Sequence, residues 1–332
     1  METEGGMTVH VAPVTCRQAC STLICFIILA CVIFPSGCSD DPTTPRAKSD
    51  VVLVWGNCGD GQCDVPGFNS GFVKVTGGNN HSLGLKSDGT IVAWGDNGGG
   101  QCDVPDLNED FVAIAAGGDC VPSPPCGNPS HSLGLKSDGT IVAWGNNGYG
   151  QCDVPSPNAD FVAVAAMGYY SLGLRADSTI VAWGANQHGQ CDVPAPNADF
   201  VAVAAGVFHA LGLKSDGTIV AWGSNQYGQC DVPSPNADFV AVAGGRSHSL
   251  GLKSDGTIAA WGLNADDGRI EVPAPNADFV AIVAGEAHSL GLKSDSTIVG
   301  WGWNYLGQCN PPAPNTGFVA IGAGSHHSLA IR

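Results

Sequence analysis

The sequence predicts an all-β fold, a seven-bladed β-propeller of three-stranded antiparallel blades. Trp-Gly pairs recur at a near-constant spacing, each repeat contains three short runs of strand-forming residues, and the two ends of the repeated region carry complementary parts of one blade. Because a single active site has no use for many copies of one segment, this repetition favours a modular scaffold.

Seven Trp-Gly pairs define the repeat, and they begin at Trp55, Trp94, Trp144, Trp183, Trp222, Trp261 and Trp301. Their spacings are 39, 50, 39, 39, 39 and 40 residues. The spacing of 50 contains an eleven-residue insertion near residues 120–129, and the spacing of 40 contains one extra residue in the loop 265–267. The register is otherwise constant, so each unit is expected to be one structural repeat.

Each unit is expected to form three strands, represented by "FVAVAAG", "HSLGLKSDG" and "TIVAWG". The Asp-Gly in Lys-Ser-Asp-Gly-Thr predicts a hairpin because glycine tolerates the positive φ of the turn, so the second and third strands pair antiparallel. Three strands cannot bury both faces alone, and the units must therefore stack on one another.

The ends of the repeated region predict a closed ring rather than an open solenoid. The region begins with a lone third strand, "VVLVWG" from Val51, and finishes with lone first and second strands that end at Arg332. An open solenoid needs polar caps at its ends, whereas these ends are apolar and complementary. We therefore expect residues 51–332 to form one propeller whose last blade is closed by the N-terminal strand.

Residues 1–37 are expected to be a signal peptide of the lipoprotein type, cleaved before Cys38. The apolar run 23–34 is shorter than the roughly 20 residues that span a bilayer. Pro35-Ser36-Gly37-Cys38 resembles the bacterial lipobox, in which the cysteine is lipidated, although that motif usually has Leu where Pro35 stands. A plain cleaved signal and an uncleaved anchor are the alternatives, and Met7 is an alternative start. All of these alternatives export the domain, either to the outer membrane or cell surface, or to the periplasm or medium.

Residues 38–50 are polar, hold two prolines and are expected to be a flexible linker.

Composition excludes several classes of function. The net charge is −17, from 13 basic and 30 acidic residues. This charge argues against binding to nucleic acid and against direct binding to an anionic membrane. Membrane contact is therefore expected only through a lipid anchor. The sequence contains no G-x-S-x-G elbow, phosphate loop or H-E-x-x-H motif. We therefore expect neither an enzyme nor a cofactor.

The motif W-G-x-N-x-x-G-Q followed by A-G-x-x-H-S-L-x-L resembles the repeat of the regulator of chromosome condensation (RCC1) family over essentially all of 51–332. Blades of 39 residues are more similar to bacterial short-blade propellers of the beta-lactamase inhibitory protein type. The resemblance implies two specific alternatives, which are guanine nucleotide exchange and inhibition of a beta-lactamase or penicillin-binding protein. The loops match neither closely enough to carry residues over.

The chain direction places the residue pair before His-Ser and the loop after Trp-Gly on one face, which we call the upper face. These loops differ most between units, and they hold residue types that dominate protein interfaces. We predict a monomeric module that binds a protein or cell-surface polymer there, with drift in solvated loops as the alternative. The candidates are Asn79, Asn80, Tyr149, Tyr169, Tyr170, His188, Val207, Phe208, Tyr227, Arg246, Glu286, Trp303, Tyr305 and His326.

Histidines and cysteines also recur at fixed positions. His81, His131, His209, His248, His288 and His327 are expected to hydrogen-bond local backbone rather than hold a metal, and no metal is predicted. Cys63, Cys102, Cys152, Cys191, Cys230 and Cys309 are expected to be core thiols, although Cys58 could pair with Cys63. Cys120 and Cys126 are the expected disulfide of the insertion. Asp192 and Asp199 are expected to cap loop backbone.

Overall fold

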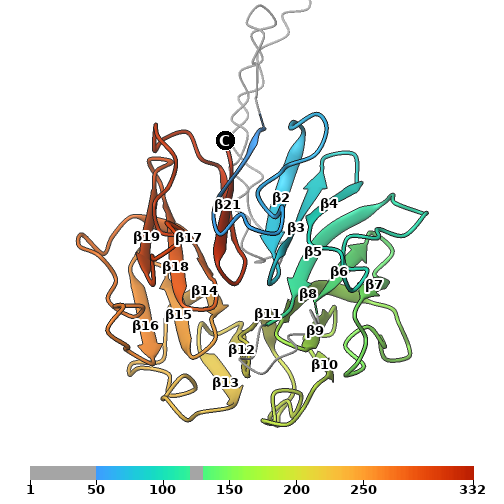
Figure 1. Ribbon diagram of the computed structural model, residues 1–332. Helices are drawn as coiled ribbons and strands as arrows, with labels where there is room; N and C mark the ends of the chain where they lie inside the picture. Colours follow the sequence, from blue (N-terminus) through green and yellow to red (C-terminus); the bar gives the residue numbers. More distant parts are fainter. Residues whose placement is uncertain (1–49, 120–129) are drawn as a thin grey trace, which may run out of the picture.

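The computed structural model describes residues 50–119 and 130–332, which form seven three-stranded antiparallel sheets arranged in a ring (Figure 1). The described residues contain no helix. The seven-bladed propeller predicted from the sequence is therefore confirmed. We number blades 1 to 6 in chain order, and blade 7 combines the two ends of the described chain.

Every blade repeats the same strand order. The inner strands are β2 (Phe72–Gly77), β5 (Phe111–Gly117), β8 (Phe161–Met167), β11 (Phe200–Ala205), β14 (Phe239–Gly244), β17 (Phe279–Ala284) and β20 (Ala320–Ala323). The middle strands are β3 (His81–Lys86), β6 (His131–Lys136), β9 (Tyr170–Arg175), β12 (His209–Lys214), β15 (His248–Lys253), β18 (His288–Lys293) and β21 (His327–Ile331). The outer strands are β1 (Val52–Gly56), β4 (Ile91–Gly95), β7 (Ile141–Gly145), β10 (Ile180–Gly184), β13 (Ile219–Gly223), β16 (Ile258–Gly262) and β19 (Ile298–Gly302).

Blade 7 closes the ring as predicted. Strand β1 pairs antiparallel with β21, and Gly56 lies opposite His327. Beyond the strand ends, Val51 and Arg332 exchange two backbone hydrogen bonds of 3.0 Å. The blue start of the described chain and the red C-terminus lie side by side in Figure 1.

The core lies between blades rather than within them. At the seam of blades 1 and 2, Leu83 and Leu85 of the middle strand pack against Phe111 and Trp144 of the next blade. Equivalent clusters fill the other six seams. The closing seam joins Leu329 and residues of β1 to blade 1 in the same way. Since apolar burial is the main favourable term in folding, each blade depends on both neighbours.

A glycine in the middle strand makes this packing possible. A Cβ atom built on Gly84 would lie 2.4 Å from the ring of Phe72 in the same blade, closer than real Cβ contacts. At the lower end of the blade, the Lys86 ammonium lies 5.1 Å from the centre of the Phe72 phenyl ring, within the range of a cation–π interaction. The lower ends of the blades are therefore built by the repeated residues themselves.

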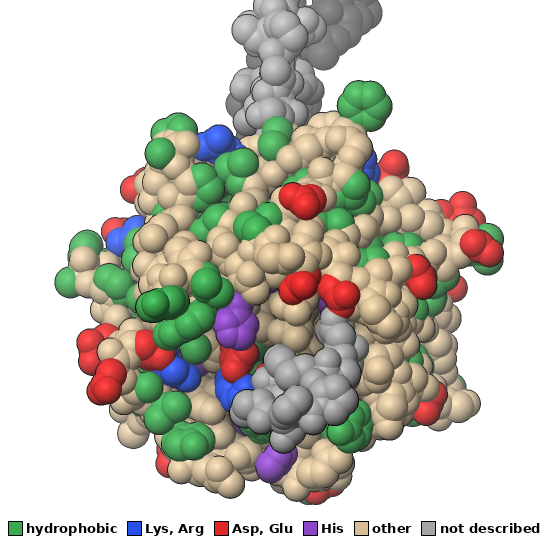
Figure 2. Space-filling view, viewed as in Figure 1, with side chains coloured by type: hydrophobic (Ala, Val, Ile, Leu, Met, Phe, Trp, Pro, Cys, Tyr) green, Lys and Arg blue, Asp and Glu red, His purple; other side chains and the backbone are tan. Residues whose placement is uncertain are grey.

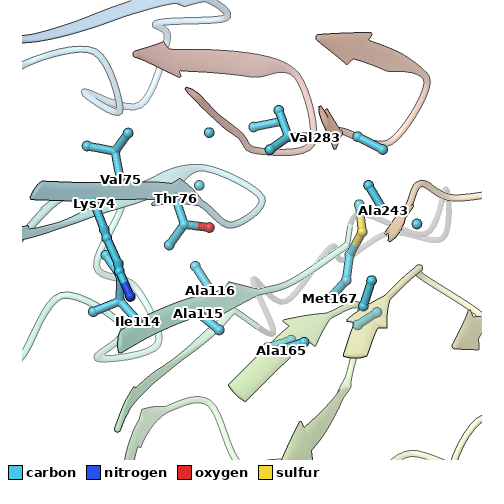
Figure 3. Close-up of a pocket in the computed structure, with 18 of the residues that line it drawn as sticks. Lys74, Val75, Thr76, Ile114, Ala115, Ala116, Ala165, Met167, Ala243 and Val283 are labelled. Carbon is cyan, nitrogen blue, oxygen red and sulfur yellow. The ribbon is translucent and has the colours of Figure 1, made fainter. Parts of the chain in front are cut away.

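The inner strands line a central channel that encloses about 230 Å³. Its wall consists largely of small apolar side chains such as Ala115, Ala116, Ala165 and Ala243, with Met167 and Thr76 among them (Figure 3). Few polar groups converge in this space, whereas ligand sites need precisely placed ones to orient a ligand. The channel is therefore a poor candidate for a ligand site, although Lys74 and Met167 distinguish blades 1 and 3 within its wall.

Candidate functional site

The two classes of variable loop lie together on the upper face. In each blade the glycine after the tryptophan pairs with the first residue of the middle strand, as Gly95 does with His81. The backbone N–H of the residue after this glycine then donates to the backbone carbonyl of the residue before the histidine, as Asp96 does to Asn80 at 2.9 Å. The face predicted from the chain direction is therefore correct, and Figure 2 shows this face.

The loop after Trp-Gly is held by its own repeated side chains. Asn97 Oδ1 accepts from the backbone N–H of Cys102 at 2.8 Å, and Asn97 Nδ2 donates to Asp103 Oδ1 at 2.7 Å. The buried Gln101 accepts through Oε1 from the N–H of Gly99. Asp192 likewise accepts from the side chain of Asn186, so its predicted role as a direct backbone cap is wrong. The loop's variable residues therefore project from a fixed frame.

The same loop joins each blade to the next. The backbone carbonyl of Gln62 accepts from Trp94 Nε1 at 2.8 Å and from Ser82 Oγ at 3.0 Å. Every other repeated tryptophan donates to the corresponding carbonyl. The tryptophans therefore serve blade packing and loop anchoring, and their indole N–H groups are not available to a ligand.

The repeated histidines also join neighbouring blades, so the prediction that they bind local backbone is wrong. His81 Nε2 lies 3.1 Å from Ser132 Oγ of the next blade. Because Ser132 already donates its hydrogen to the Gln101 carbonyl, it accepts from His81, and the imidazole carries its proton on Nε2. Burial lowers the pKa of His81 to about 3. The ring is therefore neutral at ordinary pH and has a structural partner.

The repeated cysteines fall into two groups. Cys58 and Cys63 form a disulfide, which was the stated alternative, so Cys63 is not a core thiol. Four of the other five are only partly buried, and Cys309 is buried. Burial raises the pKa of Cys102 and Cys309 to about 12, and that of Cys152 to about 11. These thiols are therefore poor nucleophiles. Cys38, Cys120 and Cys126, with residues 1–49, lie outside the described residues.

Aromatic side chains from successive loops contact one another across the blade seams. Tyr149 stacks on Tyr169 with ring centres 5.0 Å apart, and His188 meets Phe208 edge-on at 4.9 Å. In each pair, one ring comes from the loop after Trp-Gly and the other from the pair before the next middle strand. Rings from neighbouring blades therefore contact one another in separate groups around the upper face, and we call this set of side chains the aromatic arc. The arc contains Tyr149, Tyr169, His188, Phe208, Tyr227, Trp303, Tyr305 and His326.

Trp303, Tyr305 and His326 form the other end of the aromatic arc. The ring of Trp303 stacks near Tyr305 with centres 6.3 Å apart, and it meets His326 edge-on at 5.3 Å. Tyr305 is 87% exposed. Apolar and histidine side chains are seen gathered beside the centre of this face in Figure 2. Exposed aromatic rings on a rigid base suit a contact surface.

An ion-pair cluster lies at the centre of the upper face. Arg246 Nη1 lies 3.1 Å from Asp119 Oδ1 and 2.6 Å from Glu286 Oε1. Asp119 follows the inner strand of blade 2 whereas Arg246 belongs to blade 5, so the pair reaches across the upper mouth of the channel. Burial acts to lower the pKa of Arg246, but Asp119 and Glu286 outweigh it and raise that pKa. Arg246 also lies over the Phe208 ring at 5.4 Å.

A groove of about 460 Å³ opens between these features. We call it the upper groove, and its walls include His188, Phe208, Tyr227, Arg246, Arg269 and Glu286. Tyr227 is half-exposed at its rim. Five of the candidate residues named from the sequence thus meet in one hollow, although they come from three blades and the loops between them.

Three other candidates are wrong as surface residues because their side chains are buried. Asn79 and Val207 lie under the upper loops, and Tyr170 occupies the repeated histidine position inside a seam. Asn80 is partly exposed but lies outside the upper groove. Sequence reasoning also missed Asp119 and Arg269. Nothing local to Asp119 indicates a partner 127 residues away.

The described residues contain no group of three or more histidine, cysteine or acidic side chains placed to hold a metal ion. Within 50–119 and 130–332, no helix has the length and apolar character needed to cross a bilayer.

Comparison with known proteins identifies the repeat. The family model described as the regulator of chromosome condensation (RCC1) repeat matches residues 72–101, 126–151, 200–229, 239–268 and 279–308. No curated protein sequence gives a significant match.

Solved structures agree with this match. The chain is similar to Prp20p of Saccharomyces cerevisiae, whose structure was reported with its binding properties to Gsp1p and histones, at 18% identity over 86% of this chain and 92% of that one, with a TM-score of 0.70. Human WBSCR16 is 17% identical over 85% and 98%, with a TM-score of 0.65. The ectodomain of the receptor kinase CR4 from Physcomitrella patens is 25% identical over 76% and 67%, with a TM-score of 0.60. The five matched repeats and the seven-bladed ring together show that this chain contains RCC1 repeats and has the fold of an RCC1-type propeller.

Proposed function

We propose that the chain is an exported, lipid-anchored and monomeric interaction module that binds a protein or a cell-surface polymer with its upper face. The observation that carries this proposal is the upper groove with the aromatic arc beside it, because residues that vary between blades are gathered there into one surface. The residues that repeat form the frame beneath it. Most of the exposed positions that differ between blades therefore lie on the upper face.

The surface has the composition of a contact site. Tyrosine, tryptophan and arginine are the residue types most often found at the energetic centre of protein interfaces. Here they are partly pre-ordered, because Tyr149 is stacked on Tyr169 and Arg246 is held by two carboxylates. A pre-ordered surface loses less conformational entropy on binding. The groove volume lies within the range usual for ligand sites.

Two observations support a non-catalytic role. The repeated histidines are buried with neutral rings, and burial raises the pKa of the free cysteines Cys102, Cys152, Cys191, Cys230 and Cys309 far above neutral pH. Neither set supplies a general base or a nucleophile near pH 7. A similar fold serves protein binding in Prp20p, for which binding to Gsp1p and histones is reported. Nucleotide exchange and beta-lactamase inhibition remain narrower alternatives, and no residue of the upper groove favours either.

Capture of partners from periplasmic and cell-surface fractions tests the proposal. We expect the wild-type chain to retain a partner, and the combined change Tyr149→Ser, Tyr227→Ser and Tyr305→Ser to lower retention at least about tenfold, since each buried aromatic ring contributes on the order of 1–3 kcal/mol. These side chains are about half-exposed or more, so the fold should be unaffected.

The matched control is Ser156→Ala with Ser234→Ala, two exposed positions in loops outside the upper groove. This control should retain the partner as well as the wild-type chain does. Equal capture by the tyrosine variant and the control would show that binding, if it occurs, uses another face.

A further inference from the structure

We propose that the lower face of blades 7, 1 and 2 rests on a lipid bilayer, so that the upper groove points away from the membrane. The proposal rests on the anchoring part of the proposed function, and it adds an orientation and a second contact surface. Its evidence is the position at which the N-terminal segment joins the propeller, together with departures from the repeat in the blades around that position.

The N-terminal segment joins the propeller on the lower face. Strand β1 runs from Val52 at the lower face to Gly56 at the upper face, because Gly56 pairs with the first residue of β21. Val52 is fixed by the side chain of Asn69, which accepts from its N–H at 2.7 Å and donates to its carbonyl at 2.8 Å. Eleven residues lie between Cys38 and Asp50, and a fully extended chain from one to the other spans at most about 40 Å. An anchor at Cys38 therefore keeps this face near the membrane.

Exposed apolar side chains surround that position. Phe68, next to Asn69, is 90% exposed, and Leu107 in the same loop of blade 2 is 70% exposed. Blades 3 to 7 have proline at this repeat position. The large apolar side chains exposed on the lower face within the described chain are Phe68, Val73, Leu107, Val112, Val162 and Val319, and none belongs to blades 4 to 6. Exposed Phe and Leu are typical of surfaces that enter the headgroup region.

The charges change in two of the three blades, which are blades 1 and 7. An aspartate precedes the first phenylalanine in blades 2 to 6, as Asp199 does, but blades 1 and 7 have Gly71 and Gly317 there. The position has a positive φ with either residue, 64° at Asp199 and 76° at Gly71, so glycine keeps the backbone while it removes a carboxylate. Blade 1 also has Lys74 where the other blades have alanine. Both changes favour contact with a negatively charged bilayer surface.

A bilayer explains these departures better than a second copy of the chain does. Blades 2 to 6 keep one cation beside two aspartates at the lower face, as Lys214 is beside Asp199 and Asp216, so blade 2 contributes the apolar Leu107 but no change of charge. Blades 3 to 6, on the far side, carry these charges without an exposed Phe or Leu at the lower face, so they repel a bilayer surface and, with a net charge of −17, one another. The two most exposed of the apolar side chains, Phe68 and Leu107, lie in blades 1 and 2, in the sector that an N-terminal anchor would hold against lipid.

Photocrosslinking in the full-length chain tests this orientation. The photoreactive residue p-benzoylphenylalanine is placed at position 68, at position 234 in the equivalent loop of blade 5, or at position 305 on the upper face. The chain is expressed in a bacterial host, membranes are irradiated, and lipid adducts are measured by mass spectrometry. We expect adducts at position 68 to exceed those at positions 234 and 305 by about tenfold, the preference that burial of one aromatic ring supports.

The outcomes separate the two proposals. If the chain is absent from the membrane fraction, anchoring and orientation fail together. If the chain is in that fraction but position 68 gives no more lipid adduct than position 305, anchoring stands and the orientation is wrong. Crosslinks from position 68 to a second copy of the chain would also overturn the orientation, since they would assign the lower face to self-association.

Discussion

At the residue scale, two departures from the repeat compensate each other across one seam. Tyr170 stands where six blades have histidine, and Ala210 in the next blade stands where the others have serine. The Tyr170 hydroxyl extends past the small Ala210 side chain and donates to the carbonyl of His209 at 2.5 Å. A side-chain hydrogen bond thus joins neighbouring blades in both cases, whether the pair is histidine with serine or tyrosine with alanine.

This pairing predicts non-additive mutations. Tyr170→His alone should destabilise the protein by about 2–4 kcal/mol, because the shorter ring leaves a cavity and Ala210 offers no acceptor for its Nε2–H. Adding Ala210→Ser should recover about 1–2 kcal/mol by restoring the repeat's own hydrogen bond. Denaturant unfolding of the two single variants and the double variant measures the coupling. Strictly additive free energies would show that the two positions do not interact.

Single residues on the upper face were predicted only in part. The variable positions identified Phe208, Tyr227, Arg246 and Glu286, because difference between repeats indicates freedom from the scaffold. The same criterion also selected Val207, which is buried. Variation between units does not reveal which residue of a pair points outward, since that depends on how the neighbouring loop covers it.

At the element scale, the loop after Trp-Gly has the same form in every blade but is held together in two ways, by a hydrogen bond or by a disulfide. Six of these loops have asparagine at the third residue after the tryptophan, as in Asn97. In five of them its side chain accepts from the backbone N–H of the cysteine after the glutamine, whereas Asn264 donates to the side chain of Glu271. The first such loop has Cys58 there, and the disulfide to Cys63 replaces that hydrogen bond. This explains why the cysteine repeated at that position is oxidised in one unit and remains a thiol in the others.

The seams between blades make stability depend on pH. Burial lowers the pKa of the repeated histidines to about 3, and to about 4 for His209. In the unfolded chain the same groups bind protons near pH 6.5, so below that value unfolding takes up protons and the folded state loses stability. The loss ends only when the folded histidines are protonated too.

We therefore expect the free energy of unfolding to be constant above about pH 7 and to fall as pH is lowered from about 6.5 toward 4. Each histidine contributes about 1.4 kcal/mol per pH unit in this window, so the total slope is on the order of several kcal/mol per unit. Urea unfolding at a series of pH values measures the slope. A free energy that stays level between pH 6 and pH 4.5 would contradict the burial of these rings in uncharged form.

The strands and hairpins were predicted correctly because their evidence is local. Alternating Val, Ile and Ala with Asp-Gly turns places each strand and pairs the second with the third. The partner of each histidine was not predictable in this way, because it lies some 40 to 51 residues further along the chain, or across the closing seam for His327. Only the spacing of neighbouring blades brings the two residues together.

At the scale of the whole molecule, closure of the ring determines both proposed surfaces. The complementary ends predicted closure from the sequence alone, and β1 does complete the last blade. Closure puts all variable loops on the upper face and brings the N-terminal segment in on the lower face. The groove and the ion pair from Asp119 to Arg246 were beyond prediction, because they arise only when blades distant in sequence face one another around the channel.

Hydrogen exchange of β1, measured by peptide-resolved mass spectrometry on the full chain, tests closure most directly. We predict that the amides of Val52–Gly56 are protected as strongly as those of Ile91–Gly95, their equivalents in blade 1, since both strands are outer strands paired to a middle strand. Exchange in β1 at the rate of an unpaired segment, with β4 still protected, would contradict the closed ring and both surfaces inferred from it.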